Sequence, residues 1–259
     1  MSGTITKVWL KLENVSYSAG GNPILDSIGF EARGGEFIAL MGSNGAGKST
    51  LLDLIAGLHS PLSGEIKIDG RVLADWPARE LACRLSHLPQ SVGANLPFKA
   101  EQLVAMGRYP HTDTWHESEL DREEVESAMR RTHCLQFRNR RLTTLSGGER
   151  QRVLLAACLA QKAECMLLDE PSTFLDVDQQ LHCFALLQRE SAGGALCIAV
   201  THDINLALAH CTRILVLAER KVAADIAVPD AQAAPEWLKL FSPRLQMGAT
   251  PAGRPWVWF

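Results

Sequence analysis

Residues 42–50, which read GSNGAGKST, constrain this chain more than any other stretch. Their spacing, a glycine, four further residues and then glycine, lysine and serine, is that of a phosphate-binding loop. The apolar run 36–41 before the loop has the length of a buried strand, and residues 50–58 after it carry leucine and isoleucine at helical spacing. Because this motif works between a strand and a helix, the sequence predicts a nucleotide-phosphate site here.

Each residue type in the loop suits a triphosphate. Gly42, Gly45 and Gly47 have no Cβ, so the backbone can curl and direct successive N–H groups at an anion. The positive end of the following helix adds about 0.3–2 kcal/mol, too little to hold a nucleotide without the charge of Lys48. The Ser49 hydroxyl is suited to ligate Mg²⁺. The predicted nucleotide-binding residues of the loop are Gly42, Ser43, Asn44, Gly45, Ala46, Gly47, Lys48, Ser49 and Thr50.

Composition narrows the class of protein. The 259 residues suffice for one large domain or for a core with a smaller lobe, and 46% of them are hydrophobic, enough for a sizeable core. The net charge of -3 gives no basic excess, so we expect no nucleic-acid partner. The seven cysteines form no C-x-x-C pair, which favours buried thiols in a reducing compartment over disulfides or a zinc site.

No stretch of the sequence is suited to spanning a membrane. Residues 1–18 lack a continuous apolar segment, so they do not resemble a secretory signal, and no run reaches about 18 apolar residues. If the protein works at a membrane, we expect another chain to hold it there.

The first half of the chain predicts strands followed by a helical insertion. Residues 7–38 read as short strands that turn at two glycine pairs, and residues 98–142 read as a charged helical lobe inserted into the sheet domain. Within the lobe we expect helices near 99–106 and 117–132 and a loop at 108–115.

The second half returns to alternating strands and helices, which predicts a mostly parallel sheet with helices on both faces. The tail from residue 229 carries no motif that we can interpret. The expected elements are strands at 165–168 and 195–201, helices near 177–191 and 205–210, and a hairpin of 213–217 with 222–226.

An acidic strand end is the candidate for the catalytic chemistry. Residues 165–170 read CMLLDE, an apolar strand that ends in Asp169 and Glu170. In a phosphate-loop enzyme, a carboxylate at such a strand end holds the magnesium shell, and a neighbouring one can activate the attacking water, worth roughly 10²–10⁴-fold in rate. We assign the first role to Asp169 and the second to Glu170. The alternative is a strand that ends in two solvated acids.

Residues 145–153, LSGGERQRV, open a predicted helix. Ser146 and Glu149 have the spacing of a capping box, which explains these two residues without any function. Gly147 and Gly148 are an unfavourable start for a helix that needs only a cap. Bare backbone amides at this position favour the approach of a second anion.

These motifs together resemble the ATP-binding subunit of an ABC transporter, over roughly residues 8–226. LSGGERQ matches the signature motif of that family, and the other motifs follow in family order. Tyr17 resembles the aromatic residue that stacks on adenine, and Gln90 resembles the glutamine between the core and the helical lobe. Asp176 resembles the acid of the loop after the acidic strand, and His202 resembles the histidine that contacts the γ-phosphate. His59 and the other histidines match no such motif, and we assign them no role.

The resemblance implies a fold and a division of the chain. The implied fold is α/β: a phosphate-loop NTPase core with a mostly parallel sheet, an N-terminal antiparallel β subdomain and an inserted helical subdomain. The expected boundaries are 1–89 for the first part of the core, 90–160 for the helical subdomain, 161–228 for the second part of the core, and 229–259 for a tail of unknown role.

The resemblance also implies ATP hydrolysis by a homodimer. Each ATP would lie between the phosphate loop of one copy and the signature residues of the other, with Mg²⁺ held by Ser49, Gln90 and Asp169. Opening and closing of the dimer would drive a membrane permease, which places the subunit peripherally on the cytoplasmic face of the inner membrane. The implied residues in trans are Ser146, Gly147, Gly148 and Glu149, and the implied catalytic residues are Glu170, His202 and Gln90.

Three positions depart from the family pattern. Ser43 stands where many relatives have proline, Phe174 where a smaller residue is common, and Ala157 where arginine is frequent. We expect none of them to handle phosphate. Loss of the arginine removes either a structural contact or a contact of the dimer face.

We expect other chains to bind the cargo, so this sequence gives only indirect information about what is transported. Residues 103–111, LVAMGRYPH, resemble importer subunits for iron–siderophore complexes, with haem and cobalamin importers close in pattern. Residues 90–109 are the expected permease surface. We therefore expect iron–siderophore uptake assisted by an extracytoplasmic substrate-binding protein, with haem or cobalamin import as the alternative.

Two other classes of protein are alternatives to a transporter. A soluble ABC ATPase of translation or DNA repair usually carries two cassettes or a long coiled-coil insert, and a phosphate-loop GTPase carries an N/T-K-x-D segment. The sequence contains none of these features. Association with a membrane partner, rather than with ribosomes or DNA, would distinguish the transporter from the first alternative.

Overall fold

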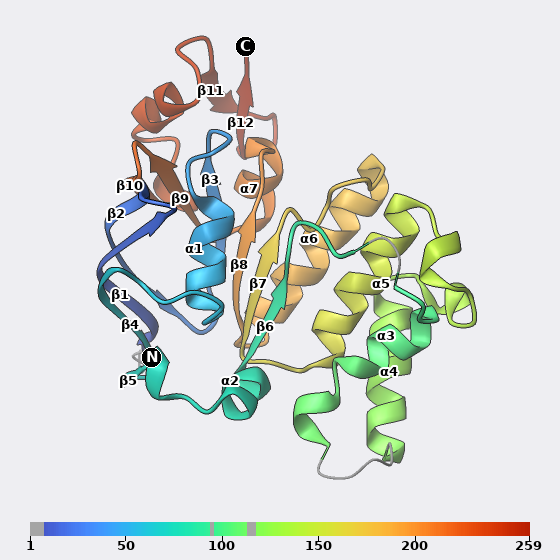
Figure 1. Ribbon diagram of the computed structural model, residues 1–259. Coiled ribbons are helices and arrows are strands. Elements are labelled where there is room, and N and C mark those ends of the chain that lie inside the picture. The colour runs from blue at the N-terminus through green and yellow to red at the C-terminus, as the bar shows by residue number, and fades with distance from the viewer. Residues whose placement is uncertain (1–7, 94–95, 113–117) are drawn as a thin grey trace, which may run out of the picture.

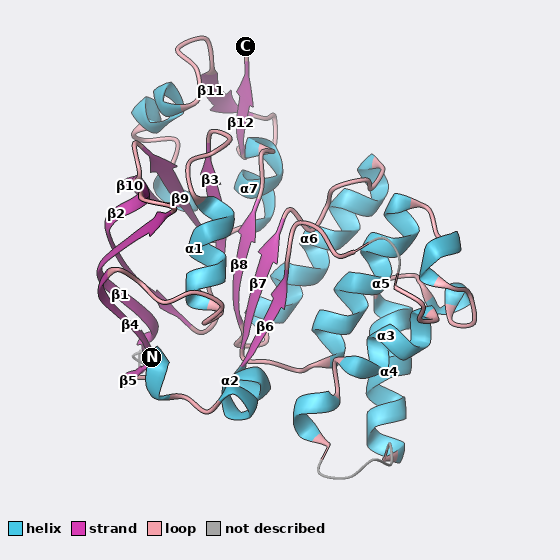
Figure 2. Cartoon of the chain, viewed as in Figure 1, coloured by secondary structure: helices cyan, strands magenta, loops and turns pink. Residues whose placement is uncertain are grey.

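The computed structural model, which describes residues 8–93, 96–112 and 118–259, contains a six-stranded sheet, an antiparallel sheet and a helical lobe (Figure 1, Figure 2). The six-stranded sheet has the order β10-β9-β3-β8-β7-β6, and every neighbouring pair except β9–β10 is parallel. Strands β3, β7 and β8 are buried along their whole length, as parallel strands covered on both faces should be. The strands are β3 (Phe37–Gly42), β6 (Leu85–Leu88), β7 (Cys165–Asp169), β8 (Leu196–Val200), β9 (Arg213–Ala218) and β10 (Lys221–Ala227).

The antiparallel sheet is built on two long N-terminal strands. Strands β1 (Val8–Ala19) and β2 (Asn22–Arg33) have 12 residues each and turn at the predicted glycine pair Gly20-Gly21. The expectation of short strands here was wrong in length, because several β-bulges let the two strands stay paired while they twist. Strands β4 (Ser63–Ile68) and β5 (Arg71–Val72) complete this sheet.

The helices follow the predicted order with one addition. A short helix, α2, lies in a segment for which we predicted no element, and α4 begins at Glu119 after the capping residue Ser118. Glu117 and residues 113–115 of the expected loop lie outside the described residues. The helices are α1 (Lys48–Ile55), α2 (Ala78–Arg84), α3 (Ala100–Met106), α4 (Glu119–Arg131), α5 (Gly147–Ala160), α6 (Val177–Ala192) and α7 (Ile204–His210).

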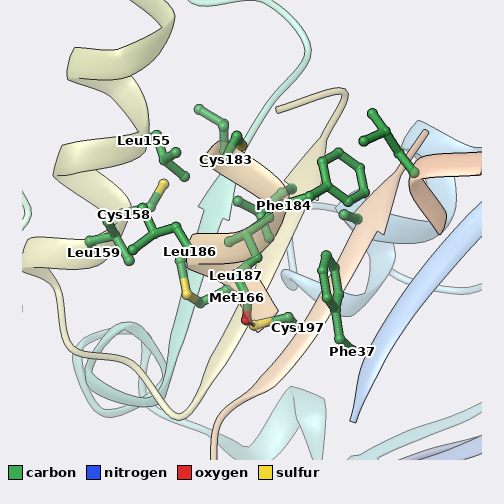
Figure 3. Close-up of a cluster of buried hydrophobic side chains, with 14 of the residues drawn as sticks. Phe37, Leu155, Cys158, Leu159, Met166, Cys183, Phe184, Leu186, Leu187 and Cys197 are labelled. Carbon is green, nitrogen blue, oxygen red and sulfur yellow. Dashed lines mark hydrogen bonds between the residues drawn. The ribbon is translucent and has the colours of Figure 1, made fainter. Parts of the chain in front are cut away.

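Alternate residues of β3 separate the core into two layers. Phe37 and Met41 belong to a cluster of buried side chains that includes residues of α5 and α6, whereas Ile38 and Leu40 belong to a second cluster with α1 and the antiparallel sheet. Figure 3 shows the first cluster, in which Phe37 packs against Phe184 with ring centroids 5.7 Å apart. The predicted α/β architecture, with helices on both faces of a mostly parallel sheet, is therefore confirmed.

The cysteines take part in this packing as free thiols. All are buried except Cys83, which is half-buried. Burial raises the pKa of Cys158, Cys183 and Cys197 to about 12, so these thiols stay protonated and act as small apolar side chains.

The tail from residue 229 is ordered against the core. After the 3₁₀ helices η5 (Val228–Asp230) and η6 (Pro235–Leu240), strands β11 (Gln246–Ala249) and β12 (Pro255–Trp258) form a hairpin that lies beside α7 (Figure 1). Trp237 and Val257 join the first cluster of buried side chains. Among the helices of the described residues, none has the length and apolar character needed to cross a membrane.

A matched pair of glycine substitutions tests how closely β4 packs on β1. Gly64 and Gly70 both have positive φ angles, 82° and 80°, but a Cβ at Gly64 would collide with the backbone of Asn14, whereas Gly70 faces open space. Gly70→Ala should cost about 1–2 kcal/mol of unfolding free energy, from its backbone conformation alone. Gly64→Ala should cost clearly more, because β4 must move away from β1. Urea unfolding measures both values, and equal losses would contradict the close packing.

Candidate active site

The core sheet brings four of the predicted segments together at the carboxyl ends of its parallel strands. Parallel strands β3, β8, β7 and β6 are neighbours, so the residues that follow them meet at their carboxyl ends. The phosphate loop follows β3, His202 comes shortly after β8, Asp169 and Glu170 lie at the end of β7, and Gln90 comes shortly after β6.

The phosphate loop has the backbone conformation that its glycines were predicted to allow. Gly42, Gly45 and Gly47 have φ angles of 145°, 78° and 93°. A Cβ at Gly42 would collide with the backbone of Leu217, and one at Gly47 would lie 2.7 Å from Leu25 Cδ2. Two of the three glycines are therefore required by close packing as well as by conformation, and α1 begins directly after Gly47 without a side-chain cap.

Lys48 is held inside this loop by the backbone. Its side chain is buried, and Nζ donates to the carbonyl oxygens of Gly42 and Ser43, at 2.9 Å in each case. Burial lowers the pKa of Lys48, against the opposing charges of Glu170 and Asp169. A phosphate anion in the loop would compensate the buried ammonium group directly.

Asp169 and Ser49 fit a divalent cation. Asp169 is buried, with only 3% of its surface exposed, and hydrogen bonding from the nearby Ser49 hydroxyl acts to lower the pKa of its carboxyl group. Its Oδ1 has no hydrogen-bond partner among the described residues. Burial, together with the nearby charge of Glu170, raises the pKa of Asp169 despite that hydrogen bond. A buried, incompletely bonded carboxylate beside a hydroxyl is an oxygen donor set suited to Mg²⁺.

Glu170 is the centre of a hydrogen-bonded cluster. Its Oε1 accepts from Gln90 Nε2 at 3.1 Å and lies 3.3 Å from His202 Nε2, while its Oε2 accepts from Thr173 Oγ1 at 3.0 Å. The structure thus brings the three predicted catalytic residues together. Gln90, which we also expected to ligate Mg²⁺, donates its amide to Glu170 here.

The backbone at Glu170 is strained and supported by a residue that the sequence analysis did not single out. Glu170 has a φ angle of 51°, which is unfavourable for a residue with a side chain. Gln151 Nε2 donates to the carbonyl oxygens of Glu170 and Pro171, at 3.4 and 3.1 Å. Gln151 is the glutamine of LSGGERQ, so its place in that motif was the available signal.

Tyr17 has an aromatic neighbour that the sequence analysis left without a role. The half-buried Tyr17 ring stacks on the exposed His59 ring, with centroids 5.5 Å apart and an interplanar angle of 26°. No pattern in the sequence connects a residue of β1 with one that follows α1. A base that stacks on Tyr17 either takes the opposite face of the ring or displaces His59.

The signature residues form a complete capping box at the start of α5. Ser146 Oγ accepts from Glu149 N at 3.2 Å, and Ser146 N donates to Glu149 Oε2 at 2.8 Å. That backbone N–H and the neighbouring Arg140 lower the pKa of Glu149. The Glu149 carboxylate is therefore engaged in holding the helix end.

The glycine pair of the signature also has a packing role. A Cβ at Gly147 would lie 3.0 Å from Phe174 Cγ, and one at Gly148 would lie 2.8 Å from the Phe174 carbonyl oxygen. Phe174, which departs from the family pattern, has a φ angle of 66° and remains 75% exposed. Glycine is thus needed here for contact with the loop after β7, as well as for any approach of an anion.

The signature residues face a pocket of their own. This open pocket, of about 450 Å³, is lined by residues of 146–152 and 174–179, including Asp176, the N-cap of α6, and by no residue of the phosphate loop. Figure 1 shows α1 and α5 on different sides of strands β6, β7 and β8. Within one chain, the structure therefore does not bring the signature residues to the phosphate loop.

Comparison with known proteins agrees with this geometry. Residues 25–173, more than half of the chain, match the family model described as ABC transporter. The hemin import ATP-binding protein HmuV of Streptomyces coelicolor is 42% identical over 79% of this chain and 73% of its own length. The cobalamin import ATP-binding protein BtuD of Halobacterium salinarum is 36% identical over 94% of this chain and 61% of its own length.

A solved structure shows the same architecture. The ATP-binding cassette MJ0796, in a dimeric post-hydrolysis state bound to ADP and Pi, superposes with a TM-score of 0.76 at 28% identity, covering 85% of this chain and 98% of that one. The motif order, the fold and these similarities agree, and the chain belongs to the ABC transporter family as an ATP-hydrolysing, ATP-binding cassette.

Proposed function

We propose that this protein is the ATPase subunit of an importer for haem, working as a homodimer beneath a membrane permease. The observation that carries the ATPase site is the gathering of Lys48, Asp169 and Glu170 at the carboxyl ends of neighbouring strands, where their side chains are suited to hold a phosphate, a cation and a water molecule respectively. The cargo rests on the 42% identity to a hemin import protein. The sequence analysis favoured siderophores, but the relatives that we compared import hemin or cobalamin, which supports its alternative.

The residues of the loop account for ATP binding. The backbone N–H groups at the start of α1 and the Lys48 ammonium would hold the β- and γ-phosphates, and Tyr17 would support the adenine. Ser49 and Asp169 would hold Mg²⁺, which supplies charge neutralisation between the phosphates when bound.

The cluster around Glu170 accounts for hydrolysis. Glu170 would accept a proton from the attacking water, and the His202 ring beside it would donate a hydrogen bond to the γ-phosphate. Gln90 comes after β6 and before α3 along the chain and donates to this carboxylate, so its amide would couple the site to the segment that leads into the helical lobe.

The second half of each site would come from a second copy of the chain. The signature pocket contains no phosphate-loop residue, so Ser146, Gly147 and Gly148 need another subunit to reach a γ-phosphate. The similar cassette MJ0796 has been solved as a dimer. Glu149 would support this contact indirectly, by fixing the end of the helix that presents the two glycines.

The permease would contact the segment at residues 90–109. In the described part of this segment, Met106 and Tyr109 are 44% and 76% exposed, so their side chains are available for contact with a partner. Docking there would keep the subunit peripheral on the cytoplasmic face of the inner membrane. An extracytoplasmic protein would deliver the cargo to the permease from the other side.

Removal of the Lys48 charge tests the phosphate loop. Lys48→Ala should weaken ATP binding roughly 10- to 100-fold, since backbone donors cannot replace a buried charged contact. Lys162→Ala, which removes an exposed lysine paired with Glu124, is the matched control and should bind ATP normally. Isothermal titration with ATP and Mg²⁺ measures both affinities. Wild-type affinity in Lys48→Ala would refute the assignment of the loop.

Removal of the Glu170 carboxylate tests both the base and the dimer. Glu170→Gln keeps the shape of the side chain but cannot accept the proton, so turnover should fall roughly 10²–10⁴-fold. Because ATP then persists, size-exclusion chromatography with ATP should show a stable dimer. Glu164→Gln removes a carboxylate next to the opposite end of β7 and should leave turnover and the oligomeric state unchanged. A monomeric Glu170→Gln variant with full turnover would count against both roles.

The cargo is tested in the complete transporter. The subunit, co-purified with its permease and placed in liposomes, should hydrolyse ATP faster when a hemin-loaded binding protein is added. Binding proteins loaded with a ferric siderophore or with cobalamin serve as the matched comparison. Stimulation by either of these and not by hemin would replace the haem assignment, and co-purification with ribosomes or DNA instead of a permease would support the soluble alternative.

A further inference from the structure

One side chain of α7, Asn205, hydrogen-bonds to the C-terminal hairpin. Asn205 Oδ1 accepts from the Val257 N–H at 2.8 Å, and Asn205 Nδ2 donates to the Val257 carbonyl oxygen at 3.0 Å. The amide thus satisfies both backbone groups of one strand residue. Val257 is only 6% exposed and Asn205 is half-buried, so this pair of hydrogen bonds is partly shielded from water and costly to leave unmade.

Asn205 lies in the first turn of α7, three residues after His202. On the other side of His202, Thr201 is buried, its N–H donates to Leu40 O at 3.3 Å, and its Oγ1 accepts from Asp203 N at 3.1 Å. Asp203 then caps α7 by accepting from Leu206 N at 2.9 Å. The backbone of His202 is therefore fixed by the sheet before it and by the first turn of α7 after it.

The first turn of α7 depends on its surroundings. The helix has only seven residues, and helices this short are unstable without tertiary contacts. Leu206, Ala207 and Leu208 supply the buried contacts with the core, and Asn205 supplies the contact with the tail. The His202 side chain is 49% exposed and touches Glu170 through Nε2, so little besides its backbone fixes where the ring lies.

We propose that Asn205 is a positioning residue for His202, and that the C-terminal hairpin serves the ATPase site by fixing Asn205. The tail then has a catalytic purpose although none of its residues reaches the nucleotide. This inference rests on the proposed role of His202 in holding the γ-phosphate.

Asn205→Ala is the direct test, in the full chain. It should lower kcat roughly ten-fold, because His202 loses its fixed position, while the affinity for ATP stays unchanged because the phosphate loop is intact. Ala209→Gly is the matched control, since it weakens the same helix at an exposed residue without touching the tail. Thermal unfolding compares the stability of both variants. An unchanged kcat in Asn205→Ala, or an equal loss in Ala209→Gly, would overturn the proposal.

A double-mutant cycle with His202→Ala separates positioning from general damage. If Asn205 acts through His202, adding Asn205→Ala to His202→Ala should lower kcat no further. Independent, multiplying losses would overturn the inference and leave the role of His202 standing. A His202→Ala variant with normal kcat would refute the role of His202 and the inference together, so the two failures are distinguishable.

Removal of residues 241–259 provides a second route to the same result. This variant deletes the hairpin and with it the partner of Asn205, so kcat should fall as in Asn205→Ala, with ATP affinity retained. Asn205→Ala in the shortened chain should then have no further effect. A shortened chain that binds ATP and keeps full kcat would overturn the inference.

Discussion

The site depends on the register of four parallel strands. Leu40 of β3 pairs with Val200 of β8, Val200 with Asp169 of β7, and Leu168 of β7 with Leu88 of β6. These pairings hold the strand ends level, so that the segments following them emerge side by side. If one strand slipped by one residue against its neighbour, its side chains would exchange faces of the sheet. The polar residue at its carboxyl end would then point into one of the two apolar layers instead of towards the site.

That alignment places two buried side chains of opposite charge, Lys48 and Asp169, in one small region. Burial shifts the pKa values of Lys48 and Asp169 in opposite directions, each towards its neutral form. The fold thus holds a cation and an anion that are only partly compensated by each other and by their hydrogen bonds. Nucleotide phosphates and a divalent cation would complement the two groups separately, which is a physical reason for the proposal that the site takes ATP and Mg²⁺ together.

Much of the fold and of the site could be predicted because the signals are local. The phosphate loop, the acidic end of β7 and the cap of α5 each lie within about ten consecutive residues, and the structure has an element boundary at every one. The contacts that were missed join distant parts of the chain: Tyr17 with His59, Gly147 with Phe174, and Asn205 with Val257. No periodicity or spacing encodes such pairs.

Gln151 connects the helical lobe to the end of β7 by two hydrogen bonds. Its backbone belongs to α5, the helix that carries the signature, while its amide grips two successive carbonyl groups at Glu170 and Pro171. A rigid-body rotation of α5 therefore pulls on the backbone that carries the Glu170 carboxylate. A movement of the lobe would therefore reach the proposed catalytic carboxylate through one side chain, which makes Gln151 a point where the orientation of α5 and the position of Glu170 depend on each other.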